Sequence, residues 1–175
     1  VLTYFKKFLK HHEMVPSEEV FGDYTPEEFD ALQDFSMRNA RSKAVRVAFE
    51  AAGKTVERHV NGFFVTRVDP NSNFRDKLKV GDIIETIDGK SPGNTDESFE
   101  ELRDYLASLE PGHTLVLQVK RDDATMTISG QLKMDSRTGG IRLGFGGEVD
   151  EDVTSDPSVE FDPHGVSGPS GGLMF

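Results

Sequence analysis

The chain has 175 residues, enough for one or two small domains. Its 31 acidic and 20 basic residues give a net charge of -11, and because an acidic surface repels phosphate backbones we expect no nucleic-acid partner. The absence of cysteine excludes disulfides, thiolate metal sites and a cysteine nucleophile. No apolar run reaches the roughly 18–20 residues that span a bilayer, and because the chain begins with Val1 we expect its native start to lie upstream.

Residues 1–24 combine apolar and basic side chains, namely Phe5, Phe8 and Leu9 with Lys6, Lys7 and Lys10. This pattern fits a membrane-proximal amphipathic turn, but a strand or loop whose lysines face water is the favoured interpretation. A helix is predicted next, because Thr25 can cap it, Pro26 suits its first position and Glu28 completes a capping box. Apolar and small residues then recur every three or four positions as far as Ala51, and Gly53 is a fitting end.

Residues 60–132 predict strands interrupted by helices. The expected elements are a strand at 62–68, a short helix at 72–78, a strand at 82–87, a helix capped by Thr95 or Asp96, and strands at 115–119 and 125–132. The second helix carries one apolar stripe, and alternation of Leu115, Leu117 and Val119 places these three on one face of their strand.

Residues 133–175 differ in composition, with 8 acids, 3 bases and nine of the seventeen glycines. Short strands are predicted at 142–145 and 159–161. The acidic run 148–152 lacks the glycine turn and ligand spacing of a calcium loop, so we interpret it as a solvated loop.

Three motifs between residues 60 and 90 occur together: Val-Asn-Gly-Phe-Phe-Val at 60–65, Leu-Lys-Val-Gly-Asp-Ile-Ile at 78–84 and Ile-Asp-Gly-Lys at 87–90. In this combination the unit resembles a PDZ domain, in the circularly permuted order of exported bacterial proteases. The resemblance implies a groove in which a peptide adds a strand and its carboxylate sits among backbone amides.

The resemblance places that groove between a strand at 63–68 and a helix at 98–109, with a carboxylate loop at 59–62. The expected peptide-binding residues are His59, Val60, Asn61, Gly62, Phe63, Phe64, Val65, Leu102 and Leu106. Gly62 would let the backbone approach the anion, and Phe63 would form an apolar pocket with Leu102 or Leu106. The alternative is that these residues are ordinary core of a small α+β domain.

The motif Gly-Pro-Ser-Gly-Gly at 168–172 resembles the nucleophile motif of exported, membrane-anchored Lon-like serine peptidases, with Gly171 where alanine is usual. The resemblance implies that Ser170 is the catalytic nucleophile and that a lysine is its base. No such lysine follows Ser170 in this chain, so we expect the fragment itself to be inactive. The alternative is a flexible glycine-rich tail. A trypsin-like arrangement is disfavoured, because there the peptidase precedes the PDZ unit.

We therefore expect an α+β chain with a helical segment at 1–57, a permuted PDZ domain at 58–132 and the truncated start of a Lon-like peptidase domain at 133–175. The parent protein would cleave peptides at the extracytoplasmic face of a bacterial membrane, held by an anchor outside this chain. We expect no metal and no cofactor. The competing hypothesis is a non-catalytic adaptor that only binds peptides.

Overall fold

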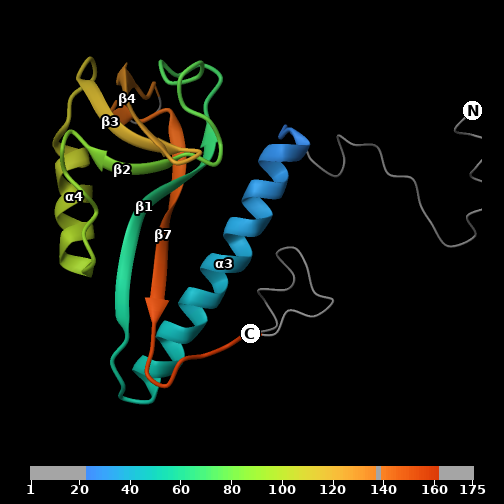
Figure 1. Cartoon of the computed structure of the whole chain (residues 1–175). Coiled ribbons are helices and arrows are strands. Elements are labelled where there is room, and N and C mark those ends of the chain that lie inside the picture. Colours follow the sequence, from blue (N-terminus) through green and yellow to red (C-terminus); the bar gives the residue numbers. More distant parts are fainter. Residues whose placement is uncertain (1–22, 137–138, 162–175) are drawn as a thin grey trace, which may run out of the picture.

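The computed structural model describes residues 23–136 and 139–161, which form a mixed α/β fold (Figure 1). Its elements in chain order are α3 (Pro26–Ala51), β1 (Glu57–Val68), β2 (Ile83–Ile87), α4 (Asp96–Ser108), β3 (Thr114–Arg121), β4 (Ala124–Gln131), β5 (Lys133–Met134), β6 (Ile141–Arg142) and β7 (Phe145–Thr154). Five strands form one sheet in the order β4-β3-β2-β1-β7, and β5 pairs with β6. The last strand therefore lies beside the first.

The predicted capping box begins α3. The backbone N–H of Glu28 donates to the Thr25 hydroxyl at 3.2 Å, and the Thr25 N–H donates to the Glu28 carboxylate at 2.9 Å. These bonds satisfy two of the N–H groups that a helix start leaves unpaired. Ala52 caps the other end, and Gly53 follows with a φ of 69°. Both predicted ends of this helix are confirmed.

The core lies between α4 and the strands. Leu115, Leu117 and Val119 are fully buried along β3, which confirms their predicted alternation, and Leu102 of α4 packs against them. The Thr95 side chain caps α4 by accepting a hydrogen bond from the Ser98 N–H. Within residues 23–136 and 139–161, no helix is both long and apolar enough to cross a lipid bilayer.

Two expected short elements are absent from the described residues. Residues 72–78 form a series of turns instead of a helix. Asp69 accepts the Asn71 N–H at 2.8 Å, and Ser72 accepts the Phe74 N–H at 3.2 Å. Such local side-chain bonds compete with helical pairing. Residues 159–161 are not a strand, because the described sheets offer them no partner.

Strand β1 is longer than predicted and pairs on both edges. β2 lies along one edge near Phe63 and Phe64, and β7 runs antiparallel along the other edge from Glu57 to Val68. The sheet therefore crosses the boundary expected at residue 133, because β7 supplies its last strand. The acidic run 148–152, expected as a solvated loop, is the middle of β7.

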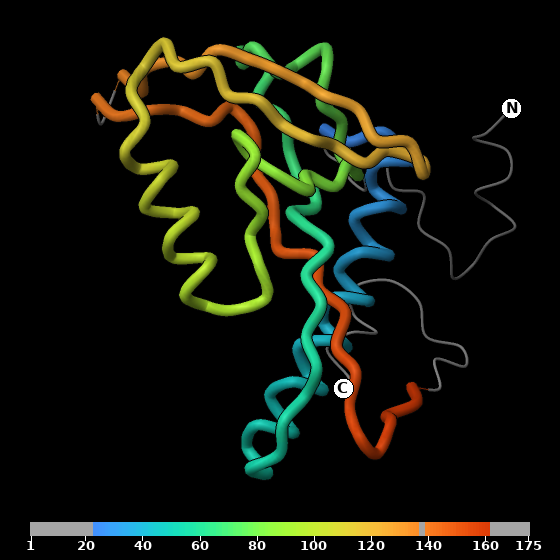
Figure 2. Tube along the Cα trace, turned by 60° about the vertical axis from the view of Figure 1, so that its left-hand side comes forward, coloured from blue at the N-terminus to red at the C-terminus, as the bar shows by residue number. Residues whose placement is uncertain are grey.

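The two long helices lie on opposite faces of the β1–β7 pair. Successive residues of a strand point to opposite faces. Phe63 meets Phe99 of α4 edge to face with ring centroids 6.1 Å apart, whereas Phe64 stacks on Phe35 of α3. Figures 1 and 2 show the same arrangement, with α4 on one side of β1 and β7 and α3 on the other.

Candidate functional site

The expected peptide-binding strand is paired on both edges at Phe63, Phe64 and Val65. The Val65 N–H donates to the Asp82 carbonyl at 2.8 Å, and the Gly81 N–H donates to the Val65 carbonyl at 3.0 Å. On the opposite edge, Phe63, Phe64 and Val65 pair with β7. At residues 63–65 a peptide cannot add a strand without displacing one of these neighbours, and the assignment of the ligand strand to residues 63–68 stays a prediction.

The expected carboxylate loop is also part of β1. His59, Val60, Asn61 and Gly62 lie in the strand and pair with β7 around a bulge. Gly62 adopts a φ of 147°, and a side chain there would collide with the Ile84 carbonyl. The glycine is therefore needed for the close approach of β2, and its predicted role toward a carboxylate stays a prediction.

The remaining predicted residues lie on the α4 side of the sheet. Leu102 is 3% exposed and belongs to the core, as the alternative interpretation expected. Leu106 and Phe63 are only half-buried and pack at the rim of that core. Whether they contact a peptide stays a prediction. Ser170 lies outside the described residues.

Among the described residues, β7 provides an open strand edge with flanking side chains. This strand ends the sheet order, and among the described residues its backbone bonds only to β1. Val149 lies opposite Phe63 and so shares the face turned toward α4. The sequence held a signal for this strand, since Phe145, Val149 and Val153 recur at even spacing, but the acidic residues between them obscured it.

The other terminal strand, β4, has an edge that is partly satisfied. The Lys77 ammonium donates to the Ser129 carbonyl at 2.6 Å, and the Asn73 amide donates to the Gln131 carbonyl at 2.8 Å. Side chains that bond to an edge reduce its capacity to accept another strand. β7 is therefore the better edge for strand addition.

Basic side chains of helix α3 form ion pairs with acidic side chains of β7. The Arg38 guanidinium lies 3.2 Å from the Asp150 carboxylate, Arg46 lies 3.5 Å from Glu151, and Lys43 lies 3.8 Å from Glu148. Glu151 is buried and also binds Arg58 of β1. Burial raises the pKa of the Asp150 carboxyl, and the Arg38 charge works in the opposite direction. The ion pairs keep α3 beside the strand while leaving its outer backbone open.

Asp88 fixes α4 to β3 on the opposite side. Its carboxylate accepts the Tyr105 hydroxyl and the Val116 N–H at 2.7 Å each, and lies 2.8 Å from His113 Nε2. Burial works to raise the pKa of Asp88, but these partners hold it below its ordinary value. The bond to Asp88 raises the pKa of Tyr105. The cluster joins the C-terminal half of α4 to Asp88, which follows β2, and to the start of β3.

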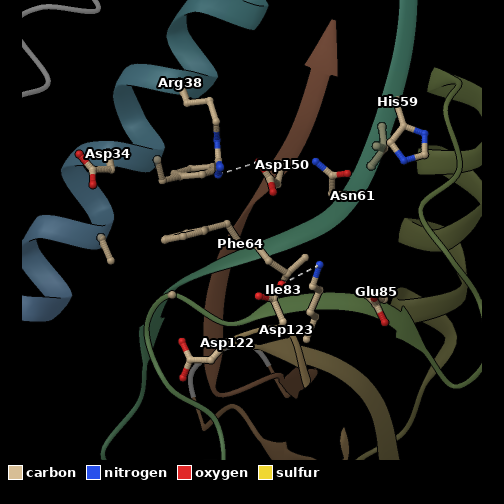
Figure 3. Close-up of a pocket in the computed structure, with 15 residues that line it drawn as sticks. Asp34, Arg38, His59, Asn61, Phe64, Ile83, Glu85, Asp122, Asp123 and Asp150 are labelled. Atoms are coloured by element: carbon tan, nitrogen blue, oxygen red, sulfur yellow. Dashed lines mark hydrogen bonds and ion pairs between the residues drawn. The ribbon is translucent and has the colours of Figure 1, made fainter. Parts of the chain in front are cut away.

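A cleft of about 620 Å³ lies on the α3 face (Figure 3). Four predicted site residues line it, namely His59, Val60, Asn61 and Phe64. Its other walls come from α3, β2, β7 and the turn between β3 and β4. Several of these lining residues are acidic: Asp34, Glu85, Asp122, Asp123 and Asp150. The structure thus separates the predicted residues into this cleft and the α4 side.

Comparison with known proteins agrees with the expected domain type. A family model described as PDZ domain matches residues 36–132. The chain is similar to the PDZ domain of the SdrC-like protein from Listeria monocytogenes, with 26% identity over 50% of this chain and 87% of that chain and a TM-score of 0.43. The PDZ domain of the SdrC-like protein from Listeria innocua is 26% identical over 50% of this chain and 93% of that chain, with a TM-score of 0.43. A solution structure of a protein from Geobacillus thermodenitrificans is 29% identical over 48% of this chain and 93% of that chain, with a TM-score of 0.40. No curated protein matches the chain.

Proposed function

Because the chain belongs to the PDZ domain family, a family of peptide-binding modules, we propose that it captures an extended peptide as an added strand along β7. The observation that carries the proposal is the position of β7 at the end of the sheet, with its outer backbone groups unbonded among the described residues. Main-chain hydrogen bonds to this edge would supply affinity that depends little on the peptide sequence.

Side chains beside the edge would supply selectivity. On the α4 side, Val149, Phe63 and Phe99 are half-buried and offer apolar contact to alternate residues of the peptide. On the α3 side, Glu148 is exposed and lies at the outer end of a weak ion pair with Lys43. A bound strand that alternates apolar and basic side chains fits both faces.

We also propose that the domain is a circularly permuted PDZ unit within an exported, membrane-anchored Lon-like serine peptidase. The sheet order supports the permutation, since β7 comes last in the chain and lies beside β1. The motif around Ser170, directly downstream, supports the peptidase. In this proposal Ser170 attacks the peptide carbonyl after a lysine elsewhere in the parent takes its proton, and the PDZ unit presents substrate outside the cytoplasm. The competing proposal is a peptide-binding adaptor without catalysis.

Peptide capture is tested with ligands selected from a phage library of random peptides with free C-termini. A selected peptide is labelled with fluorescein, and its affinity is measured by anisotropy. We expect Val149→Lys to weaken binding about tenfold or more, because about 1.4 kcal/mol of apolar contact and fit would be lost. Val116→Lys is the matched control, since Val116 is an exposed valine of β3. Equal affinity of both variants and the unaltered chain would exclude the β7 edge.

The catalytic proposal needs the full-length parent protein. Hydrolysis of a quenched fluorescent peptide library should disappear in Ser170→Ala and persist in Ser167→Ala, which alters a hydroxyl three residues away. Persistence of cleavage in Ser170→Ala would contradict the role of Ser170 as the nucleophile. No cleavage by the parent, together with intact peptide binding, would support the adaptor instead.

A further inference from the structure

The cleft on the α3 face has an aromatic floor and an acidic rim. Phe35 and Phe64 stack in its floor, and Ile83 lies half-buried beside them (Figure 3). Two of its carboxylates are paired, because Asp150 binds Arg38 and Asp123 lies 3.7 Å from Lys120. The other three, Asp34, Glu85 and Asp122, form no ion pair among the described residues. This surface fits an occupant that combines cations with apolar rings.

We propose that residues 4–10 of the same chain dock in this cleft. The segment reads Tyr-Phe-Lys-Lys-Phe-Leu-Lys, and residues 1–12 contain three lysines and no acidic residue. The other residues carry 17 bases and 31 acids, a net charge of -14, so the positive charge of residues 1–12 is complementary to the cleft. Lysine ammonium groups would pair with the three carboxylates, and the phenylalanine rings would lie against the half-buried Ile83.

The length of the intervening chain permits this contact. Lys10 precedes Asp23 by 13 residues, which can span up to about 45 Å when extended. Asp34 lies 11 residues further along α3, about 16 Å as helix. The segment can therefore turn back along α3 and reach the cleft with slack. The proposal does not depend on peptide capture at β7.

Paramagnetic relaxation in the full 175-residue chain tests the contact. The chain has no cysteine, so Thr3→Cys gives a single site for a nitroxide label. We expect loss of amide signals at residues 31–38, 59–64 and 120–123 in the labelled chain. The signals should return in the triple variant Lys6→Glu, Lys7→Glu, Lys10→Glu. They should also return in Asp34→Lys, Asp122→Lys, but not in the control Glu101→Lys, Glu110→Lys, which makes the same charge change at exposed positions of and beside α4.

Three results would overturn the proposal. The first is unchanged cleft signals in the labelled chain, or the same loss in the triple variant. The second is loss of the cleft amide signals of an isotope-enriched chain without the label when it is mixed with a nitroxide-labelled chain. This result would assign the occupant to a second copy. The third is sedimentation of the chain with phosphatidylglycerol vesicles that depends on the three lysines, while the labelled chain without vesicles shows no loss of cleft amide signals. This result would assign the segment to a membrane surface.

Discussion

Phe35 of α3 stacks on Phe64 of β1, with ring centroids 4.1 Å apart and an angle of 8° between the ring planes. The two side chains are 2% and 5% exposed. Since the preceding residue Phe63 meets Phe99 on the other face, two adjacent phenylalanines connect β1 to both helices. This pair of contacts determines where α3 and α4 lie relative to β7.

Phe35→Ala should lower the free energy of unfolding by about 3–5 kcal/mol, because it removes a buried ring and leaves a cavity against Phe64. Urea unfolding followed by circular dichroism measures the change. Val47→Ala is the matched control, since Val47 is 58% exposed on the same helix and should cost little. A loss below about 1 kcal/mol for Phe35→Ala would show that α3 is not packed on the sheet as described.

Arg121→Met should destabilise the domain by about 3–5 kcal/mol, because it leaves the Asp82 carboxylate buried without its cation. Arg121 binds both oxygens of Asp82 at 2.6 and 2.7 Å, and Asp82 is 1% exposed. The neighbouring control Lys120→Met removes only an exposed pair 3.7 Å long. Similar unfolding midpoints for the two variants would contradict a structural role for the Arg121 pair.

Asp88→Asn should lower the free energy of unfolding at neutral pH and make that free energy fall less as the solution is acidified. The folded protein holds the pKa of Asp88 below its ordinary value, so its carboxylate stabilises the fold above the unfolded value of about 3.9. That contribution is lost as pH falls through the lower, folded pKa. Unfolding free energies are measured from pH 7 to about 3, with Glu101→Gln at an exposed position of α4 as control. If the free energy of unfolding falls as steeply at acidic pH in Asp88→Asn as in the unaltered chain, the role of this carboxylate is refuted.

The sequence was sufficient where structure depends on neighbouring residues. The capping box of Thr25 and Glu28 and the alternation of Leu115, Leu117 and Val119 are local patterns, and both were predicted correctly. The motifs between residues 60 and 90 identified the domain family. Residues 72–78 were wrongly predicted as a helix, because bonds from Asp69 and Ser72 to nearby N–H groups favour turns there.

The open edge could not be predicted, because it depends on partners far apart in the sequence. Asp150 is buried in β7 only because Arg38, 112 residues earlier, is placed opposite by α3. Without that partner, an acidic run resembles a solvated loop. Pairing of β7 with β1 in turn removes the free edge that the sequence had assigned to residues 63–68. The missed strand and the unforeseen pairing of β1 therefore have one cause.

Hydrogen exchange with and without a saturating selected peptide tests the central claim most directly. The account predicts added protection of backbone amides within residues 145–151 of β7, whose outer edge the peptide would cover. The outer strand β4, residues 124–131, is the internal control and should exchange at an unchanged rate. Added protection in β4, or a saturated complex in which β7 gains none, would contradict capture along β7.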